Sequence, residues 1–188
     1  TMDVIQNETS KDYHIIQHFV GQPYLEITGR SKDRFNVYMY NGPKLVYNST
    51  IRSNNWVRLN REYYTEWKTV IKRESNDEVV YDETLSLYNK RVYIAFDSAS
   101  LGDTIAWIPY VLEFQRKHGC KVIVSTFKNF LFEDVYPELE FVKPGTEVAN
   151  LYAMYKIGWF YNENKEPVLP NTIPLQKTAT NILGEVLY

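Results

Sequence analysis

The hydrophobic pattern changes near residue 91, and this change limits the folds that the chain can adopt. VYIAF at 92–96 is a continuous apolar run, which is typical of a strand buried on both faces of a sheet. TIAWIPYVLEFQRKHG at 104–119 has apolar residues at helical spacing and ends at Gly119, as helices often do. KVIVST at 121–126 is a second apolar run. A strand, a helix and a strand in this order predict parallel pairing in an α/β sheet.

Further elements of the same kind follow along the chain. FKNFLFEDVY at 127–136 predicts a short helix, LEFV at 139–142 a third strand, and PLQKTATNILGEV at 174–186 another helix. Pro109 lies inside the first helical pattern, where it either kinks the helix or marks a later start.

Residues 13–90 show the pattern of antiparallel strands instead. YLEITG at 24–29 and FNVYMY at 35–40 are rich in β-branched and aromatic residues, and the turn signals NGPK at 41–44 and ESND at 74–77 predict hairpins. The period of two in EYYTEWKTVIKR at 62–73 places Trp67 and Ile71 on one face. YHIIQHFV at 13–20 also reads as a strand, so the spacing of His14 and His18 favours a structural role over a metal site. These segments predict an antiparallel β-sandwich or small barrel.

The sequence therefore predicts an α+β chain of two parts. A flexible N-terminus at 1–12 precedes a β-rich domain at 13–90, and an α/β part occupies 91–188. The formal net charge of −2 argues against a nucleic-acid binder. The sequence has no run of about 18 apolar residues, so no membrane span is predicted. The N-terminus lacks the features of a signal peptide. The single cysteine, Cys120, cannot form an intrachain disulfide or a cysteine-rich metal site, so a reducing, cytoplasmic compartment is expected.

The loop DSASLGD at 97–103 is the candidate site. Ligands of open α/β sheets bind beyond the carboxyl ends of the strands, and this loop leaves such an end. Gly102 permits a tight turn or a close approach of the backbone to a ligand. Asp103 is interpreted either as the helix N-cap or as a carboxylate that takes a proton from an attacking hydroxyl, and these two roles are compatible. The loop matches neither the Walker A motif nor the dinucleotide fingerprint.

A family resemblance extends this interpretation. SLGDTIAWIPYVLEFQRKHGCKVIVST at 100–126 resembles the bacterial autotransporter O-heptosyltransferases, relatives of the lipopolysaccharide core heptosyltransferases of glycosyltransferase family 9. The similarity continues through NFLFEDVYPELEFVKPG, NLYAMYKIGWFY and PLQKTATNILG. HFVGQPYLEITG and the hairpins after it resemble the β-rich N-terminal domain of this family. The resemblance covers nearly the whole chain.

The resemblance implies a two-lobed fold called GT-B, in which residues 91–188 form a Rossmann-like acceptor lobe. It implies inverting transfer of a sugar to a Ser or Thr hydroxyl of an acceptor protein, with Asp103 as the general base. The residues expected to line the substrate site besides this carboxylate are Ser98, Ser100, Leu101, Gly102, Thr104, Tyr152, Tyr155 and Trp159. Core packing is the alternative role for the last three, which are aromatic.

The family pattern also implies what lies outside these 188 residues. The C-terminal lobe that holds the ADP-heptose donor and the cysteine cluster that binds iron are both expected to be absent, so no cofactor is expected in this chain. The expected partners are an acceptor protein or glycan and, through the other lobe, a nucleotide-sugar, and a homo-oligomer is compatible with the sequence. The alternative is a non-catalytic protein- or glycan-binding module on the same scaffold, which the high content of 16 tyrosines and 4 tryptophans favours.

Overall fold

The computed structural model describes residues 12–61 and 64–157, and these fall into two compact units. The first unit contains residues 12–18, 23–59 and 66–85. The second contains the remaining described residues, which are 19–22, 60–61, 64–65 and 86–157. In the described part of the chain the structure is mostly β, with one α-helix.

The first unit is built from antiparallel strands in two sheets. Its strands are β1 (Tyr13–Val20, of which the last two residues belong to the second unit), β2 (Tyr24–Gly29), β3 (Arg34–Asn41), β4 (Lys44–Arg52), β5 (Asn55–Arg58), β6 (Trp67–Arg73) and β7 (Val79–Thr84). One sheet has the order β1-β2-β5, and the other has the order β4-β3-β6-β7.

The two sheets of the first unit bury their apolar faces against each other. The rings of Tyr13 and Phe35 lie 5.0 Å apart, and Gln17 Nε2 donates a hydrogen bond of 2.8 Å to Thr69 Oγ1. Trp67 and Ile71 are 1% and 0% exposed, so the predicted placement of these two side chains on one buried face is confirmed. Alternation of apolar and polar residues therefore determines which face of each strand is buried.

Both predicted hairpins are present. Asn41 pairs with Lys44 across the β3–β4 turn, where Gly42 has a φ of +58°. At the β6–β7 turn, Asp77 N–H donates a hydrogen bond of 2.9 Å to the carbonyl of Arg73. Asp77 has a φ of +57°, which aspartate tolerates better than most residues.

The second unit is a parallel sheet with a helix. Its elements are β8 (Arg91–Phe96), α1 (Leu101–His118), β9 (Lys121–Ser125), the 3₁₀ turn η1 (Asn129–Leu131), β10 (Glu140–Phe141) and β11 (Ala153–Ile157). The strand order is β10-β9-β8-β11, and all of these neighbours are parallel. The predicted parallel pairing of the strands on either side of the helix is therefore confirmed.

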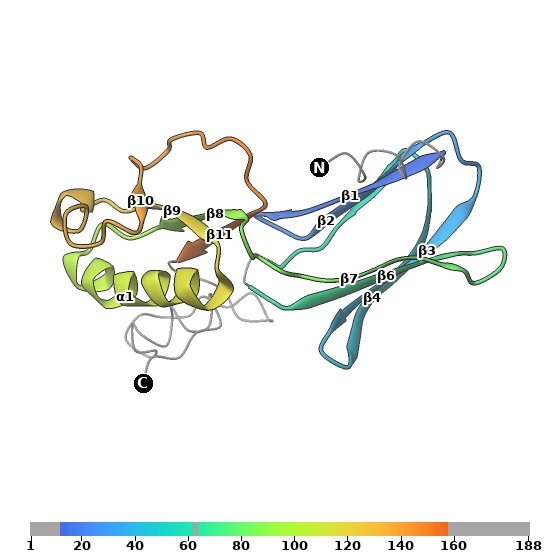
Figure 1. Cartoon of the computed structure of the whole chain (residues 1–188), viewed down its shortest axis with the longest axis horizontal. Coiled ribbons are helices and arrows are strands. Elements are labelled where there is room, and N and C mark those ends of the chain that lie inside the picture. The colour runs from blue at the N-terminus through green and yellow to red at the C-terminus, as the bar shows by residue number, and fades with distance from the viewer. Residues whose placement is uncertain (1–11, 62–63, 158–188) are drawn as a thin grey trace. The chain divides into compact units, whose positions relative to one another are not determined.

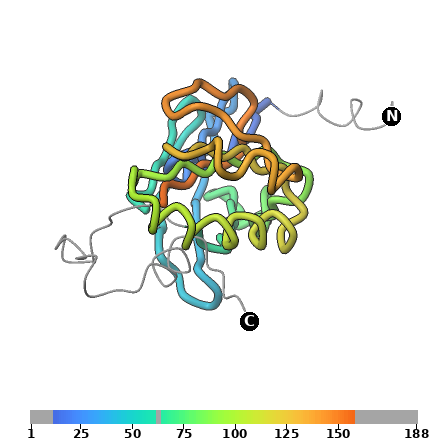
Figure 2. Tube along the Cα trace, turned by 90° about the vertical axis from the view of Figure 1, so that its left-hand side faces the viewer, coloured from blue at the N-terminus to red at the C-terminus, as the bar shows by residue number. Residues whose placement is uncertain are grey.

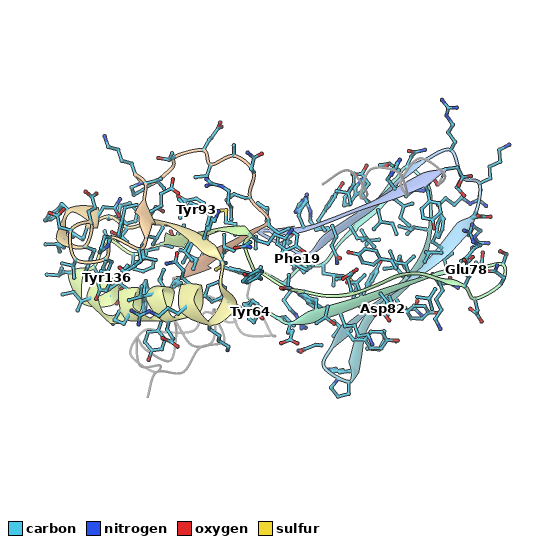
Figure 3. All side chains as sticks on the ribbon, in the orientation of Figure 1. Phe19, Tyr64, Glu78, Asp82, Tyr93 and Tyr136 are labelled. Carbon is cyan, nitrogen blue, oxygen red and sulfur yellow. The ribbon has the colours of Figure 1, made fainter. Side chains whose placement is uncertain are left out.

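The helix α1 and the segment that joins β10 to β11 lie on opposite faces of these parallel strands (Figures 1 and 2). On the helix face, the ring of Phe96 lies 5.6 Å from Trp107, and that of Tyr155 lies 6.0 Å from Phe114. Tyr64 lies beside the C-terminal end of α1, whereas Tyr93 is on the other side of the strands (Figure 3). The two faces of the sheet therefore have different surroundings.

Some sequence predictions for this unit were wrong or incomplete. The short helix expected at 127–136 is only the turn Asn129–Leu131, because Asn129 Oδ1 bonds back to the backbone N–H and hydroxyl of Thr126. The strand β11 was not predicted, because its apolar run is short. The interpretation that Pro109 marks a later helix start was also wrong, since the helix begins at Leu101 and continues past the proline. The helix expected at 174–186 lies outside the described residues.

Gly119 ends α1 in the left-handed conformation, with φ 59° and ψ 27°. We expect Gly119→Ala to destabilise the protein by about 1–2 kcal/mol or more, because alanine resists this conformation. A Cβ there would also lie 2.8 Å from the Tyr88 ring. Gly102→Ala is the matched control: this glycine is helical, and its added Cβ would meet nothing closer than 3.8 Å. Urea unfolding should show a lower midpoint for the first variant and an equal or higher midpoint for the second.

His118 packs against Tyr64 and Phe114, with ring centroids 4.9 and 4.4 Å away. Burial, with a smaller effect of Lys117, lowers the pKa of His118 from 6.5 to about 4. As the pH falls, His118 therefore takes up a proton in the unfolded chain before it does so in the folded protein. The stability that is present above pH 6.5 should be lost as the pH falls towards 4. We compare the free energy of unfolding of the wild type with that of His118→Gln. The difference between the two should decrease by about 1–2 kcal/mol over this pH range. A flat difference would contradict the buried neutral imidazole.

Candidate functional site

The loop after β8 begins at the carboxyl edge of the parallel sheet. Asp97 N–H donates a hydrogen bond of 2.8 Å to the carbonyl of Ile157, the last residue of β11. This bond ties the start of the loop to the end of the neighbouring strand. The loop then turns into α1 within four residues, so its side chains stay close to the sheet edge.

Ser100, and not Asp103, is the N-cap of the helix. Ser100 has the extended conformation of an N-cap, with φ −65° and ψ 131°, and its Oγ accepts a hydrogen bond of 3.4 Å from Asp103 N–H. Thr104 N–H and Thr104 Oγ1 both donate to the carbonyl of Ser100, at 3.2 and 2.8 Å. The interpretation of Asp103 as the N-cap is therefore wrong, because the helix begins earlier than the apolar pattern indicated.

The carboxylate of Asp103 is held by Ser98. Ser98 Oγ donates a hydrogen bond to Asp103 Oδ2 and accepts one of 3.2 Å from Ser100 N–H. In a capping box, an acidic residue three positions after the N-cap accepts this N–H directly. Here the Ser98 hydroxyl lies between the two groups, so one side chain connects the loop backbone to the carboxylate.

Gly102 and Leu101 occupy the first turn of the helix. Gly102 has no positive φ, and an added Cβ would have room, so a tight turn that requires glycine is not what the structure shows. Leu101 is 48% exposed, whereas Asp103 is 8% exposed. The structure thus brings Ser98, Ser100, Gly102, Asp103 and Thr104 together at one helix end, with the acidic group largely covered.

This arrangement places an acidic side chain among hydroxyl groups. A carboxylate is able to accept a proton from a hydroxyl that comes within hydrogen-bond distance. The bond from Ser98 Oγ shows that the site accommodates one hydroxyl donor against Oδ2.

A cavity of about 570 Å³ lies on the face of the sheet away from α1. The ends of β8, β9 and β11 and the 144–151 segment form its wall. Charged groups on this wall are Asp97, Glu147 and Lys156, and the buried Tyr93 hydroxyl donates a hydrogen bond of 2.8 Å to Ser125 Oγ. Asp103 does not line this cavity, but Asp97 does, and Asp97 starts the loop that leads to Asp103.

Sequence reasoning missed this cavity. Its residues come from four separate segments, so no local motif joins them. One signal was available: Lys156 is the one charged residue of the strand β11, as expected where one face of a strand is turned to a polar space.

The predicted aromatic residues occupy other places. Tyr155 is 4% exposed and packs on the helix face of the sheet against Phe114 and Tyr64. Tyr152 precedes β11 and lies at the opposite edge of the sheet from the 97–103 loop; its ring contacts Phe19 at 5.7 Å. Trp159 lies outside the described residues.

Metal ligation has no support in the described residues. Across 12–61 and 64–157, no group of three or more His, Cys, Asp and Glu side chains is placed to hold a metal ion. Cys120 is buried, and burial raises the pKa of its thiol to about 11. Within the part of the chain that the structure describes, no helix is long and apolar enough to cross a membrane.

Comparison with known proteins gives a consistent picture. No protein-family model matches the chain. The chain is 31% identical over 134 residues to the autotransporter heptosyltransferase Aah of Escherichia coli, a match over 69% of this chain and 34% of Aah. It is 29% identical over 137 residues to BAHTCr of Citrobacter rodentium, a match over 70% of this chain and 34% of that protein.

The chain is homologous to the autotransporter heptosyltransferases. It spans about a third of the length of the curated relatives it matches. An inactive autotransporter heptosyltransferase, BimC of Burkholderia thailandensis, is also similar, with 28% identity over 121 residues, 61% of this chain and 29% of BimC.

The fold agrees with this homology. The structure matches the crystal structure of the iron-containing dodecameric glycosyltransferase TibC from enterotoxigenic E. coli with a TM-score of 0.76 and 22% identity, covering 91% of this chain and 45% of TibC. A TibC complex with an ADP-heptose matches with a TM-score of 0.75 over the same shares and with the same identity. The described residues here offer no ligand set for the iron that TibC contains.

Ser98 should contribute to stability through its two hydrogen bonds. We expect Ser98→Ala to lower the free energy of unfolding by about 1–2 kcal/mol, because the Asp103 carboxylate and Ser100 N–H both lose a partner. Ser75→Ala, at an exposed turn position, should change it by less than about 0.5 kcal/mol. Urea unfolding of both variants measures this difference, and equal stabilities would show that the Ser98 bridge is not formed.

Proposed function

We propose that this chain is the acceptor-side part of an inverting O-glycosyltransferase. In this proposal, the enzyme transfers a sugar from a nucleotide-activated donor to a Ser or Thr hydroxyl of a protein. The observation that carries the proposal is the homology to Aah, with 31% identity over a segment that includes about two-thirds of the chain. The donor is proposed to be an ADP-heptose, the ligand of the matched TibC complex.

The proposal assigns the parallel sheet with α1 to the first Rossmann-like lobe of a GT-B enzyme. Parallel strands with a helix between β8 and β9 support this assignment, and so does the position of the 97–103 loop at a carboxyl edge. A second lobe is proposed to hold the donor opposite this edge. The antiparallel first unit is proposed to be the β-sandwich domain of the same protein.

Asp103 is proposed as the general base. Its carboxylate takes the proton of the acceptor hydroxyl while that oxygen bonds to the anomeric carbon of the donor. The bond from this carbon to the diphosphate breaks at the same time, and the nucleotide leaves with the electron pair. Because attack comes from the face opposite the leaving group, the configuration is inverted. Such a base contributes about 10²–10⁴-fold to the rate.

Ser98 is proposed to position the base. Its hydrogen bond to Oδ2 holds the Asp103 carboxylate in one orientation, so the side chain does not have to reorient before it takes the proton. The cavity beside Asp97 is not assigned the acceptor hydroxyl, because Asp103 does not line it. Tyr152 and Tyr155 are not assigned a substrate contact, given their positions.

A non-catalytic binding module is the second candidate. The specific observation in its favour is the similarity to BimC, which is described as inactive. In that case the protein would bind an acceptor protein or glycan without transferring a sugar. Self-association and a cytoplasmic location are proposed under either function, the first because TibC is dodecameric.

The test is Asp103→Asn in the protein produced from its complete gene. We expect the rate of heptose transfer from ADP-heptose to an acceptor protein to fall by about 10²–10⁴-fold, because the amide cannot take the proton. The fold should survive, since the amide oxygen still accepts the Ser98 hydrogen bond. Transfer is measured as the mass increase of the acceptor.

Asp134→Asn is the matched control. It makes the same change at an exposed carboxylate after η1, so transfer should remain at the wild-type rate. Wild-type turnover in Asp103→Asn would contradict the role of base. Binding of an acceptor by the wild type without any transfer would favour the non-catalytic module instead.

A further inference from the structure

The outer face of the β1-β2-β5 sheet carries a row of stacked rings that the transfer reaction does not use. The rings of His18 and Tyr24 lie 4.6 Å apart at an interplanar angle of 11°, and those of Tyr24 and Trp56 lie 6.0 Å apart at 19°. The guanidinium of Arg58 lies 5.7 Å from the Trp56 ring and 5.8 Å from the Tyr24 ring. We call these four side chains, together with Glu26, the aromatic row.

The register of the strands explains the row. His18 pairs with Tyr24, Tyr24 with Arg58, and Glu26 with Trp56, so alternate residues of three neighbouring strands meet on one face. The residues that alternate with Tyr24 and Glu26 along β2 are Leu25 and Ile27, which point to the buried face and are 0% exposed. The row is therefore on the solvent side of the sheet. Figure 1 shows β1 and β2 of this sheet side by side.

Trp56 is the open end of the row. It is 58% exposed, although tryptophan is highly buried on average. Among the described residues, β5 is the outermost strand of this sheet, so no neighbouring strand covers the indole face that is turned away from Tyr24. Stacking on Tyr24 and Arg58 limits the motion of the indole from the other side. The result is a flat aromatic surface that is held in place and open to solvent.

The polar groups beside the indole indicate the ligand. Arg58 supplies several N–H donors, and Glu26 supplies carboxylate acceptors, one of which receives the Tyr24 hydroxyl at 2.9 Å. The charges of Arg58 and Glu26 cancel. A neutral polyol needs both donors and acceptors and no net charge, whereas a nucleic acid or an acidic peptide would need a positive excess.

We infer that the aromatic row is a binding site for a neutral sugar, in which one face of a pyranose ring stacks on Trp56. The C–H groups of that face pack against the electron-rich indole. Vicinal hydroxyls at the ring edge bond to the Arg58 guanidinium and the Glu26 carboxylate. The choice of heptose as this sugar rests on the proposed function: the site would hold a heptose already attached to the acceptor while another residue is modified.

Calorimetric titration tests this inference with three probes: methyl heptoside, a short serine peptide that carries one O-linked heptose, and the same peptide without sugar. We expect the two sugar-bearing probes to bind the wild type and the bare peptide not to bind. Trp56→Ala should weaken sugar binding by about tenfold or more, because the stacking surface is lost. Trp56→Phe should stay within a few-fold of the wild type, since it keeps a smaller ring.

Two further variants separate this site from the transfer site and from general surface effects. Phe130→Ala removes a 72% exposed ring of the second unit and should leave sugar binding unchanged. Asp103→Asn should also bind the sugar probes as the wild type does, although it is expected to lose transfer. If Asp103→Asn kept transfer, the proposed function would fail while the sugar site could still be demonstrated.

Three results would overturn the inference. The first is no binding of either sugar-bearing probe to the wild type. The second is that the bare peptide binds as tightly as the sugar-bearing probes and that Trp56→Ala abolishes this binding. The surface would then recognise polypeptide. The third is sugar binding that survives Trp56→Ala but is lost in Asp103→Asn, since the sugar would then occupy the transfer site.

Discussion

The candidate site depends on the central position of β8. This strand forms hydrogen bonds with β9 on one side and β11 on the other, and its side chains Val92 and Ile94 are fully buried. A strand held on both edges cannot shift its register without losing two sets of hydrogen bonds. The loop that leaves its carboxyl end is fixed as a result, first by the bond from Asp97 to Ile157 and then by the helix cap at Ser100.

Helix capping and the proposed chemistry involve the same loop. Ser100 caps α1, and Ser98 connects the loop backbone to the Asp103 carboxylate. Capping alone would require only one polar side chain at the N-cap. The additional carboxylate, largely covered and held in one orientation, is what a base for proton transfer requires. The geometry is therefore compatible with the proposed role of Asp103.

Local patterns predicted much of the fold. The β8-α1-β9 succession, both hairpin turns and the end of the helix at Gly119 followed from periodicity, turn residues and a glycine in the left-handed conformation. Prediction failed where a local signal was weak or ambiguous. The five-residue strand β11 has too little sequence to establish a period, and the position of the N-cap depended on which serine hydroxyl the Asp103 N–H reaches. Tyr155 could not be assigned to core or cleft, because that depends on which face of the sheet the helix covers.

The sequence by itself determined where α1 and most of the strands form and placed Asp103 near a helix start, since these features depend on residues close together in the chain. Only the tertiary structure decided what those elements meet. The pairing of Ala153 with Val92, the cavity beyond β8 and the stacking of Tyr24 on Trp56 join residues that are far apart in sequence. Such contacts form through the burial of whole faces and the register between strands, and no short stretch of sequence specifies them.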